Sequence, residues 1–280
     1  MLVLLQRRRR EDFVHPTSRI LRVYLWAVLH DRPTYWACDR RNWAGARPPA
    51  VMPDQSTMSR RLRHPATLAM MMNLLDELEP DACDTLVKCV DGKPLTVSRH
   101  SRDKTATFGR GAGGLDRGYK LHAVYGDTNK PAAFAIFPMN VDERDVALEL
   151  IPKVAPGYLL ADGNYHATRL FDASAQAGQV LIAPRRMANG GKQPKGVGRG
   201  PQSPHRLAMI DRLASPTNPY ARDLLATRRA VETRLAHLCN FGGGLTCLPP
   251  WVRGRRVRPW VIAKIAVRLT RDRRRREMRA

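Results

Sequence analysis

Two short segments decide the fold: LVKCVD at residues 86–91 and YLLAD at residues 158–162. Each is an apolar run of the kind found in strands buried in a sheet, and each ends on an aspartate. Because the carboxyl ends of parallel strands meet at one edge of an α/β sheet, where ligands bind, we expect Asp91 and Asp162 to lie close together. The two segments therefore predict a sheet and also the place of its functional site.

Further apolar runs predict three more strands, and helical spacing between the later strands predicts crossover helices. The strands are expected at residues 119–125, 132–137 and 180–183, and the helices at residues 145–154, 167–177 and 219–238. A meander of three strands followed by parallel strands with crossover helices is the ribonuclease-H-like plan, an α/β architecture with a mixed sheet. Residues 187–204 hold too much glycine and proline for either element and are expected to form a basic loop.

The sequence before the sheet is typical of helices. An apolar stripe predicts a helix at residues 19–29, a short helix follows at 56–63, and another at 66–78. This order predicts a helix-turn-helix-like unit, in which the short helix presents Arg60, Arg61 and Arg63 to DNA, although a plain solvated basic helix would give the same pattern.

The chain is therefore expected to have three parts. A helical, helix-turn-helix-like DNA-binding domain would span residues 1–82, the α/β domain with its basic loop at 187–204 would span residues 83–250, and a basic C-terminal helix would span residues 251–280.

The charge of the chain points to a polyanionic partner. Its 280 residues include 48 Lys plus Arg against 25 Asp plus Glu, a net charge of +23, which favours nucleic acid over a membrane surface. The apolar start at residues 2–5 precedes the basic run at residues 7–10, the reverse of a secretory signal, and no apolar run reaches 18 residues. We therefore expect a soluble, cytoplasmic protein.

The five cysteines include no C-x-x-C pair and support neither a disulfide framework nor a structural zinc site.

A third acid, Glu232, lies in the predicted late helix, in the segment RRAVETRL at residues 228–235. Three segments, DGK at 91–93, ADGNY at 161–165 and the R-x-x-x-E pattern at 228–232 that ends on Glu232, resemble the three signatures of DDE transposases from bacterial insertion sequences. Further likeness lies in GYKLH at 118–122, NVDER at 140–144 and LPPWVRG at 248–254. The resemblance spans most of the chain and implies a ribonuclease-H-like catalytic core.

The resemblance implies that Asp91, Asp162 and Glu232 are the catalytic residues and the metal ligands. Three carboxylates suit Mg²⁺ or Mn²⁺, because hard cations prefer oxygen ligands and two such ions can clamp the attacking and leaving oxygens of a phosphodiester. Arg228 stands one helical turn before Glu232, where it could contact a DNA phosphate or form an intrahelical ion pair. The residues expected to bind DNA are Arg60, Arg61, Arg63, Lys120, Tyr165 and Arg228.

The activity implied is DNA transposition: metal-dependent cleavage at transposon ends, then transfer of the 3′ hydroxyl into target DNA. The implied partners are the terminal inverted repeats, the target DNA and further copies of the chain, as a homodimer or higher oligomer on nucleoid DNA, with no membrane. Two alternatives remain open: a ribonuclease-H-like nuclease without joining activity, and a DNA-binding protein derived from an inactive transposase. The chain departs from the family pattern at Leu225, where the family has Tyr, and at Cys239, where it has Lys.

Overall fold

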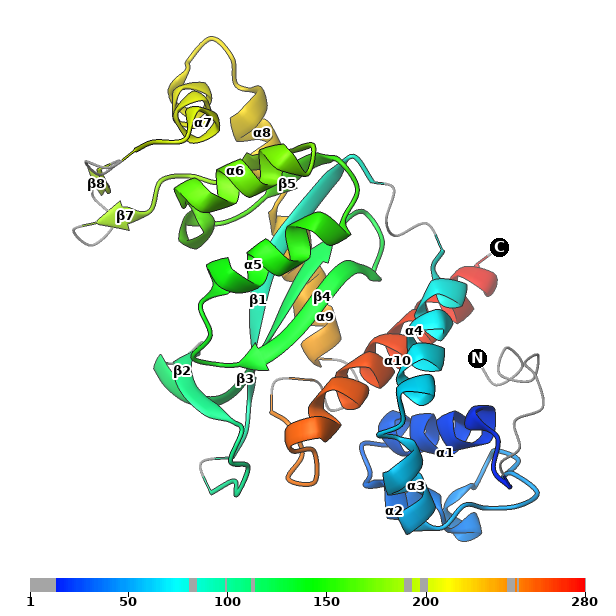
Figure 1. Ribbon diagram of the computed structural model, residues 1–280. Helices are drawn as coiled ribbons and strands as arrows, with labels where there is room; N and C mark the ends of the chain where they lie inside the picture. Colours follow the sequence, from blue (N-terminus) through cyan, green and yellow to red (C-terminus); the bar gives the residue numbers. More distant parts are fainter. Residues whose placement is uncertain are drawn as a thin grey trace. The chain divides into compact units, whose positions relative to one another are not determined.

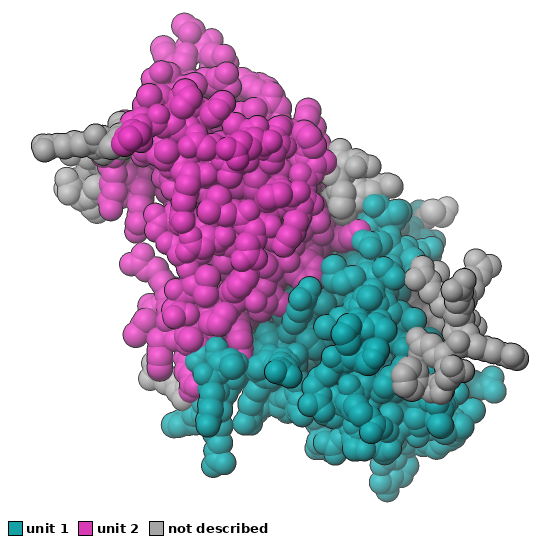
Figure 2. Space-filling view, in the orientation of Figure 1, with its two compact units in different colours: residues 1–80, 96–106, 238–280 teal, residues 81–95, 107–237 magenta. Residues whose placement is uncertain are grey.

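The structure is a computed structural model that describes residues 14–80, 85–98, 100–111, 114–188, 193–196, 201–240, 245 and 247–279. The chain divides into two compact units (Figure 2). One comprises residues 1–80, 96–106 and 238–280 and is called the helical unit below. The other comprises residues 81–95 and 107–237 and is called the sheet unit.

The sheet unit is built on a mixed sheet (Figure 1). Its strands are β1 (Val87–Thr96), β2 (Thr107–Gly111), β3 (Gly114–Tyr125), β4 (Pro131–Pro138), β5 (Gly157–Leu160) and β6 (Gln179–Ile182). Their order is β2-β3-β1-β5-β6, and β2 and β4 pair antiparallel with successive halves of β3. β5 runs parallel to both β1 and β6. The mixed α/β fold expected from the sequence is therefore confirmed.

β2 was not expected from the sequence, because TFGRG has no alternation of apolar residues. Its position in the sheet depends on Gly109, where an added Cβ would collide with the Met139 carbonyl oxygen. A glycine in a strand commonly marks such a close backbone approach.

Two crossover helices join the parallel strands: α5 (Glu143–Leu150) and α6 (Thr168–Gln176). They contact each other and the sheet, and each buries an apolar face. Both predicted helices are confirmed with shifted bounds. α5 begins earlier because the Asp142 side chain accepts a hydrogen bond from the Arg144 N–H, and it ends before the 3₁₀ turn η3 (Ile151–Lys153).

The segment after β6 is more helical than expected. A small hairpin, β7 (Met187–Ala188) with β8 (Gln193–Pro194), occupies part of the expected loop at 187–204, and α7 (Pro204–Ala214) follows. Residues 189–192 and 197–200 of that loop lie outside the described residues. The single helix expected at 219–238 is two helices, α8 (Tyr220–Ala226) and α9 (Arg229–Asn240), separated by a turn at Thr227 and Arg228.

The helical unit contains α1 (Thr17–Leu29), α2 (Thr34–Ala37), α3 (Gln55–Arg61), α4 (Pro65–Leu78) and α10 (Val257–Glu277), with short 3₁₀ turns η2 (Arg40–Asn42) and η6 (Gly254–Arg256). α10 packs against α4 and α1, and α1 packs against α2 and α3. The three helices expected before the sheet are therefore present. No helix among the described residues is both long and apolar enough to cross a bilayer.

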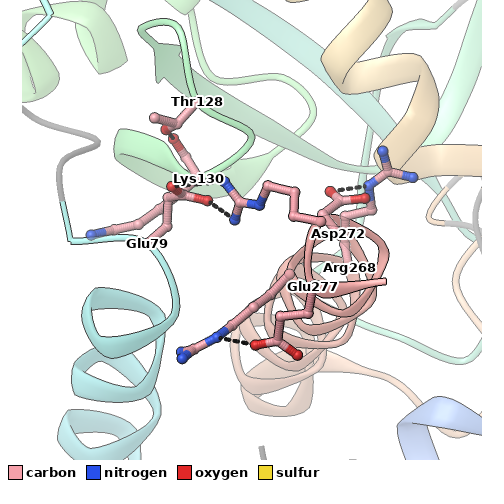
Figure 3. A network of polar contacts seen from close by, with 8 residues as sticks. Glu79, Thr128, Lys130, Arg268, Asp272 and Glu277 are labelled. Carbon is pink, nitrogen blue, oxygen red and sulfur yellow. Dashed lines mark hydrogen bonds and ion pairs between the residues drawn. The ribbon is translucent and has the colours of Figure 1, made fainter. Parts of the chain in front are cut away.

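The C-terminal helix differs from the separate basic segment that the sequence suggests. The part of α10 from Val257 to Leu269 is mostly buried, and the buried Lys264 pairs with Asp31 of the helical unit. Beyond it, Arg268 donates to Asp272 at 2.8 Å and Arg273 to Glu277 at 3.1 Å (Figure 3). The first half of α10 is thus part of a hydrophobic core, and only its last turns form a basic surface.

Candidate active site

Asp91 and Asp162 occupy equivalent positions on neighbouring strands. The parallel pairing of β1 and β5 runs from Val87 opposite Tyr158 to Cys89 opposite Leu160, and each aspartate follows two residues later. Since adjacent strands lie about 4.8 Å apart, the two backbones place both residues at the same edge. Asp91 lies within β1, which continues to Thr96, and not at the end of the strand as the apolar run suggests.

The Asp91 carboxylate lies in an environment that disfavours its negative charge. Burial, with smaller contributions from the negative charges of Asp162 and Glu143, raises its pKa from 3.8 to about 6. A hydrogen bond that the Gly92 N–H donates to Oδ1 at 2.8 Å and the charge of Arg228 oppose the rise. A partly buried carboxylate near other acids has most to gain from a bound cation.

Asp162 is held by the turn that follows it. It caps the 3₁₀ turn η4 (Gly163–Tyr165): Oδ1 accepts a hydrogen bond from the Asn164 N–H at 2.8 Å, and Oδ2 accepts one from the Asn164 side chain at 3.3 Å. The cap that orients this carboxylate is therefore encoded locally, in the segment DGN.

A fourth carboxylate, that of Glu143, belongs to the same neighbourhood. Lys120 Nζ on β3 donates to Glu143 Oε1 at 2.5 Å. A Cβ at Gly92 would lie 3.1 Å from Lys120 Cδ and 3.4 Å from Glu143 Oε1, so this glycine lets the pair approach Asp91 closely. Sequence reasoning did not single out Glu143, because an acid in the first turn of a helix is most often a favourable dipole contact.

Tyr165 is a buried residue beside these acids. It is 1% exposed, and its hydroxyl has no hydrogen-bond partner among the described residues. Burial, followed by the charges of Glu143, Asp91 and Asp162, raises its pKa well above the usual value. Its hydroxyl therefore stays protonated in the neighbourhood of the carboxylates.

Glu232 pairs with Arg228 at the start of α9. Arg228 Nη2 donates to Glu232 Oε1 at 2.6 Å, which is the intrahelical ion pair considered as one of the two alternatives. The charge of Arg228 also acts on Asp91, whereas the Glu232 side chain is 51% exposed. Arg234 Nη2 donates to the Asp127 carbonyl oxygen at 2.9 Å and fastens α9 to the turn between β3 and β4.

The three expected acids do not form a closed ligand set in this arrangement. Among the described residues, no three His, Cys, Asp or Glu side chains are close enough to hold one ion. Asp91 and Asp162 share an edge, and the Glu232 carboxylate is engaged by Arg228.

The expected DNA contacts divide into exposed and buried side chains. Arg60 and Arg63 are exposed on and just after α3. Arg61 is 7% exposed and donates to Thr17 Oγ1 at 2.7 Å, so in this arrangement its side chain makes a packing contact within the helical unit. Lys120, which is 7% exposed and paired with Glu143, and Tyr165 are also buried, within the sheet unit.

His122 is buried in β3, and its two ring nitrogens have no hydrogen-bond partner among the described residues. Burial, with the nearby charge of Lys120, lowers its pKa from 6.5 to about 4. Between these two values the unfolded chain binds a proton that the folded chain does not, so this site lowers stability as pH falls from about 6.5 toward 4.

We expect His122→Leu to remove roughly 2 kcal/mol of the stability lost between pH 7 and pH 5. Urea unfolding at the two pH values would measure the loss within each protein, so a general change in stability of the variant cancels. His205→Leu, at an exposed position on α7, is the matched control. An equal loss in the wild-type protein and the His122 variant would contradict this expectation.

A mixed sheet whose parallel strands β1 and β5 bring two aspartates to one edge is the arrangement expected of a polynucleotidyl transferase with a ribonuclease-H-like core. A family model described as "Transposase DDE domain" matches residues 82–249. The chain therefore belongs to the DDE transposase family, an enzyme family whose substrate is DNA and whose members generally use divalent metal ions. No curated protein and no solved structure matches the chain.

Proposed function

We propose that this transposase cleaves DNA at the ends of a transposon and joins the freed 3′ hydroxyl to target DNA, with Asp91, Asp162 and Glu232 as its catalytic carboxylates. The observation that carries the proposal is the register of β1 and β5, which sets Asp91 level with Asp162. Family membership supports the reaction class, and the influence of Arg228 on Asp91 supports the approach of Glu232 from α9.

The chemistry of these residues fits a divalent ion. Asp91 has its pKa raised to about 6 by burial and neighbouring acids, a cost that a bound cation would remove. Bound Mg²⁺ or Mn²⁺ supplies activation of the attacking oxygen and neutralisation of the leaving oxygen. Asp162 stays oriented by its Asn164 cap, and Glu232 would join the ligand set by exchanging its Arg228 contact.

Arg228, once released from Glu232, would be available to a DNA phosphate at the site, since its guanidinium offers several donors in a planar fork. The exposed Arg60 and Arg63 and the basic end of α10 would supply further phosphate contacts in the helical unit. We infer that the terminal inverted repeats are the DNA bound and that two or more copies of the chain act together on the two transposon ends.

Cleavage and joining should both require a divalent metal. With an oligonucleotide duplex carrying the transposon end and a supercoiled target plasmid, we expect products with Mg²⁺ or Mn²⁺ and none with EDTA, whereas a zinc-selective chelator should have no effect. The reason is that carboxylate oxygens suit hard cations and no thiolate or imidazole ligand is needed. Nicked duplex without joined plasmid would indicate a nuclease, and undiminished joining in EDTA would contradict the proposed chemistry.

A further inference from the structure

A cavity of about 220 Å³ opens in the sheet unit beside the turn that caps Asp162. Gly163 and Asn164, the two residues after that aspartate, form part of its wall. The remainder comes from Arg144 on α5, from His166, from the residues that flank the β7–β8 hairpin and from Arg206 on α7. None of the proposed catalytic carboxylates lines this cavity.

Among the residues that the structure describes, the wall of the cavity carries four cationic side chains and no acidic one. They are Arg144, Arg186, Lys195 and Arg206. They come from four places in the sequence, so the fold and not a local basic run gathers them. Arg144 is compensated by Asp142 at 2.5 Å, and Arg186 and Lys195 are exposed. Several like charges converge here at a cost in repulsion that a bound anion would offset.

The backbone holds two of these cations next to the Asp162 turn. The Lys195 N–H donates to the Arg186 carbonyl oxygen at 2.7 Å, which closes the base of the β7–β8 hairpin. A Cβ at Gly163 would lie 3.3 Å from Arg186 Cα, so the hairpin base packs directly on the turn after Asp162. The position of the cations relative to the catalytic aspartate is therefore set by main-chain contacts.

Arg206 is the most buried of the four, with 9% of its surface exposed. Its guanidinium contacts Gln202 Oε1 at 2.6 Å and His166 Nδ1 at 3.3 Å. Burial, followed by the charge of Arg185, lowers its pKa. Burial, followed by the charge of Arg206, lowers the pKa of His166 to about 4. Its ring is therefore neutral at pH 7 and does not add another cation. A buried guanidinium beside a neutral imidazole, an amide and another cation is placed to receive an anion.

We propose that this cavity binds one backbone phosphate of the DNA, next to the phosphate that is cleaved at Asp162. A phosphodiester matches the cavity because it is a compact anion with acceptor oxygens for a guanidinium fork and an ammonium group. Binding there would position the strand, because phosphate contacts fix the register of DNA on a protein. The inference rests on the proposed function, and it makes Arg186, Lys195 and Arg206 positioning residues that do not touch the reacting atoms.

The test combines side-chain and backbone neutralisation. Lys195→Gln and Arg186→Gln remove exposed cations and should leave the fold intact, Arg206→Gln removes the buried one, and Arg212→Gln is a matched control at an exposed position on the same helix as Arg206. The substrates are transposon-end duplexes in which a methylphosphonate replaces one phosphate at a time around the cleavage site. Affinity is measured by fluorescence anisotropy in Ca²⁺, and cleavage in Mg²⁺.

On the unmodified duplex, we expect each cavity variant to weaken binding by up to about tenfold and to lower the salt slope by about 1. On the duplex neutralised at the bound phosphate, the same variants should lose nothing further, whereas Arg212→Gln should change all duplexes equally. Cleavage should fall mainly through a higher KM, because these residues position the DNA.

Two results would overturn the inference while the proposed function stands: cavity variants that match Arg212→Gln on every duplex with cleavage intact, or a loss that is the same wherever the methylphosphonate is placed. Inorganic phosphate could also compete with DNA in the wild-type protein and not in Lys195→Gln, without any position-specific loss on DNA. That result would indicate a site for free anions and would also reject the DNA assignment. Failure of the wild-type protein to cleave, together with a position-specific loss in binding, would reject the proposed function and leave the cavity assignment in place.

Discussion

Substitution of Asp91 by Asn, Asp162 by Asn or Glu232 by Gln will lower DNA cleavage and joining by about a thousandfold or more. In the proposed mechanism all three carboxylates bind metal as one unit and each change removes an anionic ligand, so single and multiple substitutions should have similar effects. Initial rates of cleavage and of strand transfer on end duplexes would measure the loss. DNA binding in Ca²⁺ should persist or tighten, because a negative charge near the phosphates has been removed.

Asp145→Asn is the matched control, since Asp145 is an exposed acid on α5 whose partner is Arg169 at 2.5 Å. It should retain nearly full activity. Strand transfer by the Glu232→Gln protein at the wild-type rate would contradict the assigned set of three acids. Glu143, whose charge already acts on Asp91, would then be the acid to substitute next.

The stability of the Asp91 variant separates a catalytic loss from misfolding. The folded pKa of about 6 exceeds the unfolded value near 3.8, so this group's contribution to stability is present below about pH 4 and is lost as pH rises to about 6. Without metal at pH 7 the protein carries the whole penalty, about 1–3 kcal/mol. Asp91→Asn should therefore unfold at a higher temperature than the wild-type protein in EDTA, although it is inactive.

Replacement of Trp260 by Ala will destabilise the helical unit by about 3–5 kcal/mol. Trp260 lies on α10, is 2% exposed and has Lys264 Nζ 5.3 Å from its ring centroid, so truncation leaves a large cavity in the core. Hydrogen exchange followed by mass spectrometry should show the loss as faster exchange in α1, α4 and α10, the helices that pack together in this unit.

Two variants control for the position and for the size of the side chain. Arg258→Ala, at an exposed position on the same helix, should change stability by less than about 0.5 kcal/mol. Trp260→Phe retains most of the ring volume and should cost less than the alanine variant. Unchanged exchange in α1 and α4 of the Trp260→Ala protein would show that the C-terminal helix is not part of this core.

The predictability of the site differs among its residues for physical reasons. Asp91 and Asp162 could be assigned because a buried strand is recognisable from a short apolar run, and the acid that follows it is placed by the geometry of a parallel sheet. The cap on Asp162 is equally local, since its donors belong to Asn164, two residues later. The ion pair of Arg228 with Glu232 follows from the four-residue spacing on one helical face.

Glu143 and Arg206 could not be found in this way, because their importance comes from partners far along the chain. Glu143 reaches Asp91 through its pairing with Lys120 on another strand, and Arg206 reaches the cavity through packing of α7 beside α6. Neither the distance between such segments nor the direction of a side chain is present in a local pattern.

The sequence by itself determined the secondary structure that its periodicity encodes: the parallel strands with their aspartates, the crossover helices and the N-terminal helices. Only the tertiary structure decided which charged side chains face solvent. On α3, Arg60 is exposed whereas Arg61 is buried against Thr17, although both look equally basic in the sequence. The arginine-rich helix α10 contributes Trp260 and its neighbours to the core of the helical unit. Whether a side chain is buried depends on what the rest of the chain packs against it, and that partner is known only once the chain has folded.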